Sequence, residues 1–547
     1  MLLTGWGVAS TTLLPAQTTT NAAPVTLTFG NIDASTNAAP AVTDATNAPA
    51  STETATPSAP AGVAQAAPAA PPSAEVVAPA ALPYSIASGF LLALMAFGSI
   101  LGFLLYQSGL TRAKNCGHTV TLLLVGTMLG LISFWVGGFA VQSGGLGDNN
   151  TVHLAASLYG RAINGALDHE LGFMAGGHYW GLMGDSSFFL ITYPDARNAV
   201  TTIFLGQAAL LVIALVATMG AALERGRIMP MAVVAFVIGA VIYPLFANWT
   251  WGGGWLAALG RDYGLGNGFV DIGGAGVVHE TAGVLALALT LVLGPRYGRF
   301  IPEKKSRPIA GHNLPFVVLG AVILLLSWMA ANALFDSGAQ VVPHTSTSVE
   351  LAAVNTLLAA GSGLFFSLLL ASWRKGRPEP VQLCRGLLGG AVASCGCCAL
   401  IDPWAAFIIG GVAGLLVQGA ANGMNRRGID DPTGAIAVHG LGGAWGVLAT
   451  GLFANNSMTI GFNGVGSDVR GLFFGGAWHQ LAAQAIGGLT CFVVVFVLGY
   501  ACFGSIKKIF GLRVALADET GGLDWPQIGA LGYQGDAEPD DLPGIKN

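Results

Sequence analysis

The sequence predicts an all-α polytopic membrane protein, and three observations support this fold class. Of the 547 residues, 53% are hydrophobic and only 9% are charged, which is about a third of the charged share of an ordinary soluble domain. Glycine occurs 79 times, and small residues let membrane helices approach closely. Long stretches without Asp, Glu, Lys or Arg recur from residue 83 onward. This composition excludes a typical soluble enzyme, a collagen, a coiled coil and a highly charged disordered chain.

Eleven segments are candidates for transmembrane helices, each of which needs about 20 mostly apolar residues. They lie near residues 85–107, 119–141, 200–222, 230–248, 275–294, 315–335, 350–372, 384–401, 403–424, 436–455 and 479–504. The runs are long and continuous rather than short and alternating, which favours helices over a membrane β-barrel.

Basic residues are distributed unequally over the predicted loops. The loops after odd-numbered segments, together with the residues after the last segment, hold 19 of the 23 Lys and Arg residues, and the remaining loops hold 4. Positively charged loops are typical of the cytoplasmic side. We therefore expect a multi-pass protein of the inner (plasma) membrane with its N-terminus outside and its C-terminus in the cytoplasm, as an odd number of spans requires.

The chain divides into three regions by composition. Residues 1–82 contain no Lys or Arg and are rich in Ala, Pro, Thr and Ser, which predicts a low-complexity disordered N-terminal region. Its first 17 residues weakly resemble a signal peptide that lacks the basic start. Residues 83–510 form the predicted membrane domain, and residues 511–547 form a cytoplasmic C-terminal tail.

The two halves of the membrane domain show a weak internal similarity. Val278-His279 is followed by a glycine four residues after the histidine, and Val438-His439 is followed by a glycine at the same spacing. These sequences lie on the fifth and tenth predicted segments. A five-plus-five arrangement places the two repeats in opposite membrane orientation, as in inverted-repeat transporters.

His279 and His439 lie inside apolar segments. Ionisable groups at that depth are costly, and they usually mark a pathway or a proton relay. Imidazole suits such a relay because it accepts and donates protons near neutral pH. Two alternatives are buried histidines bonded to backbone carbonyls and a pair of metal ligands. His279-Glu280 lacks the second histidine four residues later that a zinc hydrolase carries, which argues against zinc hydrolysis.

A tryptophan-rich segment, NWTWGGGW at 248–255, precedes the first of these histidines. Tryptophan faces attract cations, although tryptophan is also common in interfacial belts. Asp271 lies eight residues before His279. A carboxylate there would favour a cation over an anion, and it can also act as a helix N-cap.

At this point the sequence resembles a known family over roughly residues 83–535, the ammonium transporter family (Amt/Mep/Rh superfamily). The supporting segments are GLTRAKN (109–115), GDSSFFL (184–190), ERGR (224–227), NWTWGGGW (248–255), DIGGAGVVHETAG (271–283), GHNLPFVVLG (311–320), VNTLLA (354–359), DPWAAFIIGGVAG (402–414), DDPTGAIAVHGLGGAWGVLATGLFA (430–454) and GLRVALADETGGLD (511–524). Each segment alone is a weak signal, but their joint order is highly specific.

The resemblance implies a homotrimer of eleven-helix protomers that transport ammonium or ammonia, each through its own narrow pore. His279 and His439 match the family's paired pore histidines. Trp251 matches its cation-recruiting tryptophan, and Asp271 matches its pore-mouth aspartate. Ammonium is expected to be recruited outside as a cation and to cross with the proton and ammonia handled separately. The resemblance also implies a PII-type signal protein as a partner, docked on the basic inner loops and Gly511–Gly529.

The sequence departs from the family at the outer end of the predicted pore. Leu210 and Ala331 occupy the gate positions where the family stacks two Phe rings, and Phe335 stands where it has a Ser beside the recruiting tryptophan. Phe204 is an alternative gate residue from another turn. Glu280 follows the first pore histidine, and a helix places it about 100° round, so we expect it to face a neighbouring helix or subunit.

The remaining features carry no chemistry in this interpretation. We expect no cofactor, no metal site and no enzymatic activity, and we interpret Cys395, Cys397 and Cys398 as small packing residues. Two alternative functions are an ammonium sensor of the same fold and a channel for substituted amines. Such sensors usually carry a fused signalling domain, and only about 40 residues follow the last predicted segment, which favours transport.

Overall fold

The computed structural model describes residues 86–144, 170–194, 197–301, 305–336, 349–456 and 462–533. The predicted low-complexity region 1–82 lies outside these residues. The chain divides into two units, Met1–Ala78 and Pro79–Asn547, and the described residues all belong to the second.

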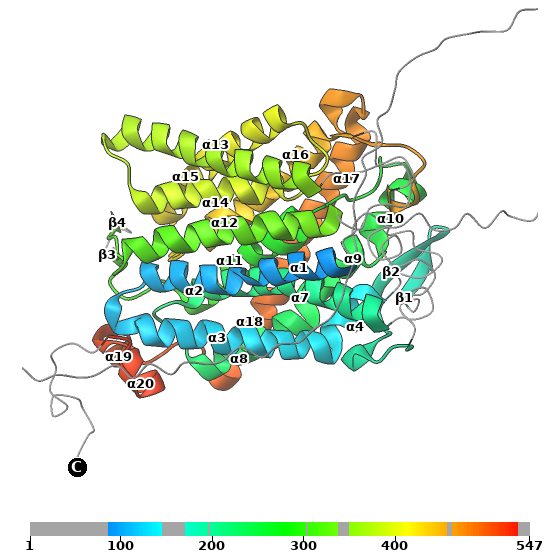
Figure 1. Ribbon diagram of the computed structural model, residues 1–547. Helices are drawn as coiled ribbons and strands as arrows, with labels where there is room; N and C mark the ends of the chain where they lie inside the picture. The colour runs from blue at the N-terminus through cyan, green and yellow to red at the C-terminus, as the bar shows by residue number, and fades with distance from the viewer. Residues whose placement is uncertain are drawn as a thin grey trace, which may run out of the picture. The chain divides into compact units, whose positions relative to one another are not determined.

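The second unit is a bundle of long apolar helices (Figure 1). Within the described ranges, ten helical stretches are long and apolar enough to cross a membrane. They are built, in chain order, from α1 (Ile86–Phe97) and α2 (Ser99–Leu110), α3 (Cys116–Ser133) and α4 (Phe139–Ser143), α7 (Arg197–Met219), α8 (Ile228–Val237) with α9 (Tyr243–Trp251) and α10 (Trp255–Tyr263), α11 (Thr281–Leu293), α12 (Leu314–Asp336), α13 (Val349–Lys375), α15 (Pro403–Arg427), α16 (Gly442–Phe453), and α17 (Ala477–Thr490) with α18 (Phe496–Phe510). Ten of the eleven predicted segments coincide with them.

The eighth predicted segment, 384–401, is the one that differs. It forms α14 (Pro380–Ser394), which has 15 residues and is roughly 22 Å long at the usual helical rise. The predicted end at residue 401 was wrong, because the chain turns after Ser394 while remaining apolar. Cys395, Cys397 and Cys398 lie in this turn and are almost fully buried, as expected for packing residues, and all three are free thiols.

Short strands and helices mark the two ends of the bundle (Figure 1). At one end, called the hairpin end, β1 (Glu170–Ala175) pairs antiparallel with β2 (His178–Gly184) beside α10. At the other, called the tail end, lie the strand pair β3 (Phe300–Ile301) and β4 (Lys305–Ser306) and the helices α19 (Leu516–Gly521) and α20 (Asp524–Ile528). A third short pair joins β5 (Asn455–Asn456) to β6 (Val469–Arg470).

A buried ion-pair network holds the loops of the tail end together. Arg296 donates to Glu224 at 2.7 Å and to Asp430 at 2.8 Å, and Arg225 donates to Asp430 at 3.0 Å. Burial by itself would raise the pKa of Glu224, but Arg296 and Arg112 lower it to about 2. These charges therefore stay ionised, and removing one partner would leave another buried and unpaired.

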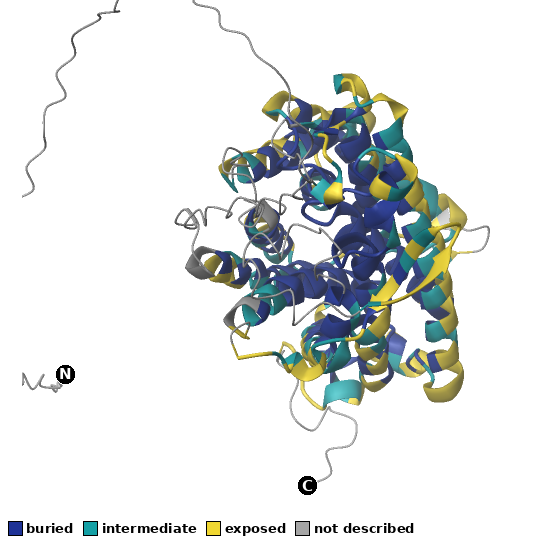
Figure 2. Cartoon of the chain, turned by 90° about the vertical axis from the view of Figure 1, so that its right-hand side faces the viewer, coloured by how far each residue is buried: buried dark blue, intermediate teal, exposed yellow. Residues whose placement is uncertain are grey.

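The C-terminal segment is tied to the same end of the bundle. The carboxylate of Asp524 accepts the backbone N–H groups of Gly117 and His118, at the start of α3. Glu519 accepts the backbone N–H of Tyr297 at 2.6 Å and pairs with Arg513. Viewed from the hairpin end, the buried residues occupy the centre of the bundle and the exposed residues its margin (Figure 2).

Candidate functional site

The structure brings His279 and His439 into direct contact at the centre of the bundle. Their Nδ1 atoms are 2.9 Å apart, and both residues are nearly fully buried. Because one Nδ1 must donate and the other accept, the two rings hold opposite tautomers when neutral. The pair then leaves one Nε2 as an acceptor and the other as an N–H donor.

Each histidine lies on a short π-helical turn at the start of a membrane helix. His279 lies in Ala275–Glu280 before α11, and His439 lies in Ile436–Leu441 before α16. π-Helical turns inside α-helices occur frequently at functional sites. The two halves of the chain therefore present their histidines from the same local structure.

Asp271 caps the first π-helical turn. Its carboxylate accepts the backbone N–H groups of Ala275, Gly276 and Val277 at 2.8–2.9 Å. Trp251 Nε1 donates to the backbone carbonyl of Asp271 at 2.7 Å. The contacts of Asp271 are therefore those of a helix N-cap, which was one of its two predicted roles. Trp251, the predicted recruiting tryptophan, lies next to it.

Asp431 caps the second π-helical turn in the same way, and the sequence analysis missed it. It lies eight residues before His439, as Asp271 lies eight before His279, and it accepts the N–H groups of Ile436 and Ala437. Aligning the two histidines of the internal repeat would have found it. The repeat thus extends from aspartate through histidine to glycine.

The glycines four residues after each histidine explain how the two turns meet. A Cβ on Gly283 would lie 2.0 Å from the backbone nitrogen of Gly440, and one on Gly443 would lie 2.5 Å from the carbonyl oxygen of Ala275. Both distances are impossible for a side-chain carbon. The shared glycines therefore permit the close backbone approach that puts the histidines in contact.

Two aromatic rings enclose the histidine pair. The Trp328 ring centroid lies 5.0 Å from that of His279 and 5.5 Å from that of His439, edge to face in both cases. Phe103 from α2 lies 6.1 Å from His439. The sequence analysis assigned these two rings no role, because their contacts with the histidines join segments that are distant in the sequence.

The tryptophan-rich segment 248–255 serves two structural purposes. Trp249 donates from Nε1 to the backbone carbonyl of Leu182, and Trp255 packs on Trp180 of β2 with centroids 5.3 Å apart. These residues hold the β1–β2 hairpin against the bundle. Trp251 alone turns toward Asp271.

The two predicted gate positions are packed into the core. Leu210 is fully buried and Ala331 is 2% exposed. Phe204 stacks on Phe134 at 5.6 Å and meets Phe139 edge to face, so its ring joins a cluster between α7 and α4. The side chain of Phe335 lies outside the described residues.

Glu280 faces neighbouring helices, as expected. The residue is 3% exposed, and a Cβ on Gly488 of α17 would lie 3.5 Å from its Oε2. On the other side, its backbone lies against Gly443 of α16. Oε2 has no hydrogen-bond partner within the described part of the chain.

A bundle of membrane-crossing helices around a buried pair of ionisable side chains is typical of multi-pass membrane transport proteins. Comparison with known proteins agrees. Residues 89–533 match the Ammonium Transporter Family, and the chain is 32% identical to the ammonium transporter Amt2 of Archaeoglobus fulgidus over 82% of this chain and 87% of the relative. Among solved structures, the "Sensor Amt Protein" is 28% identical with a TM-score of 0.66, over 81% of this chain and 98% of that one. Mep2 of Candida albicans is 25% identical with a TM-score of 0.65, over 84% and 92%.

The chain therefore belongs to the ammonium transporter family. The family membership, the helical membrane fold and the multi-pass character expected from the sequence are confirmed.

Proposed function

We propose that this protein transports ammonium by passing the proton through His279 and His439 while ammonia crosses the apolar path beside them. The observation that carries this proposal is the Nδ1–Nδ1 contact of 2.9 Å between two buried rings. Such a pair accepts a proton at one Nε2 and releases another proton from the opposite Nε2. Neutral ammonia lacks the large desolvation cost of the ammonium ion, so it can enter the apolar path.

The hairpin end recruits the cation. Trp251 offers an aromatic face, Asp271 offers negative charge, and Phe335 is the third residue that we assign to recruitment. Cation–π contacts contribute roughly 0.5–2 kcal/mol depending on desolvation. Potassium has no N–H to donate and no proton to release, so it is attracted to this mouth but does not pass the histidines.

The protein acts as a homotrimer of protomers with eleven transmembrane helices in an inverted five-plus-five repeat. The ten long helices and the shorter α14 together supply the eleven spans. The 19-to-4 distribution of basic residues orients the tail end toward the cytoplasm. The hairpin end then faces outward across the inner membrane, residues 83–510 form the transport domain, and residues 511–547 form its cytoplasmic tail.

A PII-type signal protein docks on the tail end. The exposed basic loops and Gly511–Gly529 lie there together, and the segment is fixed by Glu519 and Asp524. We expect a PII protein of the same organism to co-purify with the transporter in at least one nucleotide state and to reduce flux. If the PII protein neither co-purifies nor reduces flux in any nucleotide state, it is not a partner, and the proposed transport function still stands.

Replacing the second pore histidine tests the relay. We expect His439→Ala to abolish or strongly reduce the ammonium-driven current of reconstituted protein, because the remaining ring has no proton acceptor. Current is measured on a solid-supported membrane with ammonium, methylammonium and potassium. The size of the purified particle shows whether the variant still assembles as a trimer.

The matched control is His479→Ala, which removes a histidine at the hairpin end that stacks on Trp478. It should conduct as the unmodified protein does. An unchanged current and unchanged exclusion of potassium in His439→Ala would refute the relay. Equal currents for ammonium and methylammonium in the unmodified protein would instead favour the substituted-amine alternative, and binding without current would favour a sensor.

A further inference from the structure

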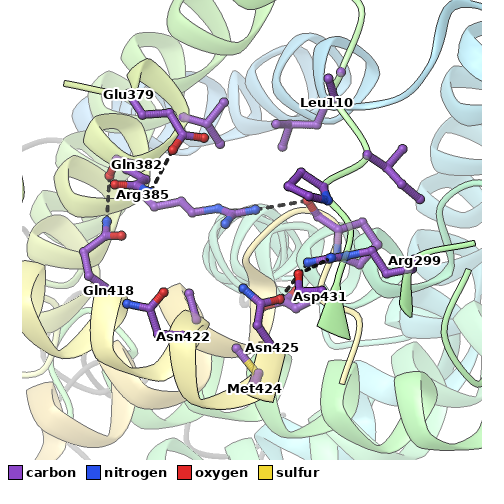
Figure 3. Close-up of a pocket in the computed structure, with 18 of the residues that line it drawn as sticks. Leu110, Arg299, Glu379, Gln382, Arg385, Gln418, Asn422, Met424, Asn425 and Asp431 are labelled. Carbon is purple, nitrogen blue, oxygen red and sulfur yellow. Dashed lines mark hydrogen bonds between the residues drawn. The ribbon is translucent and has the colours of Figure 1, made fainter. Parts of the chain in front are cut away.

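Two pockets bear on the tail side of the proposed path: one is lined by His439, and the other is lined by residues of the tail-end loops. The narrow one is lined by His439, Tyr106 and Thr433, and Tyr106 donates its hydroxyl to the Thr433 carbonyl. The wider one has a volume of about 440 Å³ and is lined by Leu110, Asp431 and further polar side chains (Figure 3). Helix α2 and the segment 431–435 contribute to both pockets. The two pockets are therefore lined by neighbouring residues of the same two segments, and we take the wider one as the tail-side mouth of the proposed path.

Arg385 extends across this wider pocket (Figure 3). It projects from the second turn of α14, and its Nη2 donates to the carbonyl of Pro432 at 3.1 Å. A Cβ on Gly434 would lie 2.7 Å from its Nε, so the guanidinium packs directly on the turn that precedes the π-helical turn of His439. Its Nε has no hydrogen-bond partner among the residues that the structure describes.

The charge of Arg385 is not cancelled by a direct ion pair. Arg296 and Arg299 also line the pocket, but both pair with Asp430. Arg385 forms no such pair within the described ranges, and Glu379 at the rim is exposed to solvent. Of the three arginines that line the wider pocket, Arg385 is therefore the one that forms no ion pair within the described ranges.

The two mouths of the path thus differ in charge although their caps are alike. At the hairpin end, Asp271 caps its turn, and no Lys, Arg or His of the described residues forms an ion pair with it. At the tail end, Asp431 caps its turn in the field of Arg385. Asp431 lines the same pocket as Arg385, and Arg385 opposes the rise that burial causes in the pKa of Asp431.

We propose that Arg385 prevents the tail-side mouth from recruiting ammonium, so that the protein binds its substrate much more weakly from the tail end than from the hairpin end. This inference rests on the proposed transport function. A fixed positive charge at the mouth repels an approaching cation, while neutral ammonia passes it. At zero voltage and equal pH, kcat/KM must be equal in both directions, so the higher KM on the tail side is accompanied by a proportionally higher kcat.

The experiment measures KM and kcat from each side. Protein reconstituted in one orientation, verified by protease access to its tail, receives ammonium from outside or inside the vesicle at zero voltage and equal pH. We expect a tail-side KM at least tenfold above the hairpin-side KM. Arg385→Gln should bring the two within about threefold by lowering both tail-side constants, and Arg385→Lys should keep the asymmetry because it keeps the charge.

Arg427→Gln is the matched control, since it removes an exposed charge from the same end of the bundle. It should leave both KM values unchanged. Equal KM values in the unmodified protein, or an asymmetry that persists in Arg385→Gln, would overturn this inference while leaving transport in place. Equal KM values would be measured on the unmodified protein, so that result does not depend on whether a variant folds. The absence of any saturable ammonium current from either side would instead overturn the proposed function, and this inference with it.

Discussion

The segments 271–293 and 431–453 occupy corresponding places in the two halves of the bundle. Both have an aspartate, a histidine eight residues later, and a glycine four residues after that. In both, the aspartate caps a π-helical turn that carries the histidine. The environments of the two aspartates differ, because Trp251 donates to the backbone of Asp271 whereas Arg385 lies near Asp431.

This difference distinguishes the features that both segments share from the features that only one of them has. The repeated elements position the two histidine rings, and backbone hydrogen bonds and glycine contacts hold these elements in place. The residues that distinguish the two ends come from other helices, α9 for Trp251 and α14 for Arg385. In the proposed path, one scaffold therefore supports two mouths that differ in electrostatic character.

The largest expected effect comes from breaking the contact between the two segments. Gly283→Ala would place a Cβ 2.0 Å from the backbone nitrogen of Gly440, so the helices must separate. We expect a loss of about 1–3 kcal/mol of stability and of most transport, measured by thermal unfolding in detergent and by ammonium-driven current.

The control is Gly419→Ala, at a helical position where an added Cβ meets nothing within 4 Å. It should match the unmodified protein or be slightly more stable, because alanine favours helix more than glycine does. A Gly283→Ala protein with unchanged melting temperature and current would show that the close approach is not required.

A second prediction sharpens the contrast between the mouths through pH. Burial raises the pKa of Asp271 to about 6, although the N–H groups of Val277, Gly276 and Ala275 oppose the rise. Above that pH the carboxylate is charged and, in the recruitment role that we propose, attracts ammonium; below it the carboxyl is neutral. The hairpin-side KM should therefore rise as the pH falls through about 6.

Asp271→Asn tests the assignment of that pH dependence. The amide keeps one acceptor oxygen for the backbone cap but carries no charge at any pH. Its hairpin-side KM should be high and nearly independent of pH between 5 and 7. A profile that still bends near pH 6 in this variant would assign the titration to another group.

The smallest expected effect concerns the gate positions. Leu210 and Ala331 supply less volume than two Phe rings and no aromatic face. We therefore expect a weaker preference for ammonium over methylammonium than in a Phe-gated relative. Leu210→Phe combined with Ala331→Phe should raise that preference about twofold to fivefold, as a weak cation–π contact would.

Both positions are tightly packed, so the two rings need space that neighbouring side chains must provide. Methylammonium and ammonium currents are compared in the unmodified and doubly substituted proteins, with thermal unfolding as the check on packing. Identical preference ratios in two equally stable proteins would mean that the aromatic gate has no influence on substrate choice.

Hydropathy was sufficient to place ten of the eleven helical segments, since a span of apolar residues has few alternatives in a bilayer. It failed at the end of α14, because a buried turn is as apolar as a helix. His279 and His439 could be selected by their depth and by family resemblance, but their contact depends on glycine packing between distant segments. The positions of Arg385 and Trp328 relative to the path depend on tertiary contacts, for which one sequence contains no local signal.

In the proposed relay, the contact between the two Nδ1 atoms also makes each proton transfer depend on the transfer before it. When a proton enters at one Nε2 and another leaves from the opposite Nε2, the two rings exchange tautomers. The direction of the Nδ1–H···Nδ1 hydrogen bond is then reversed. A second proton cannot follow in the same direction until the hydrogens are reset. A passing ammonia molecule, which can both donate and accept hydrogen, is suited to perform that reset. The pair would then transfer one proton for each substrate molecule and would not conduct protons continuously.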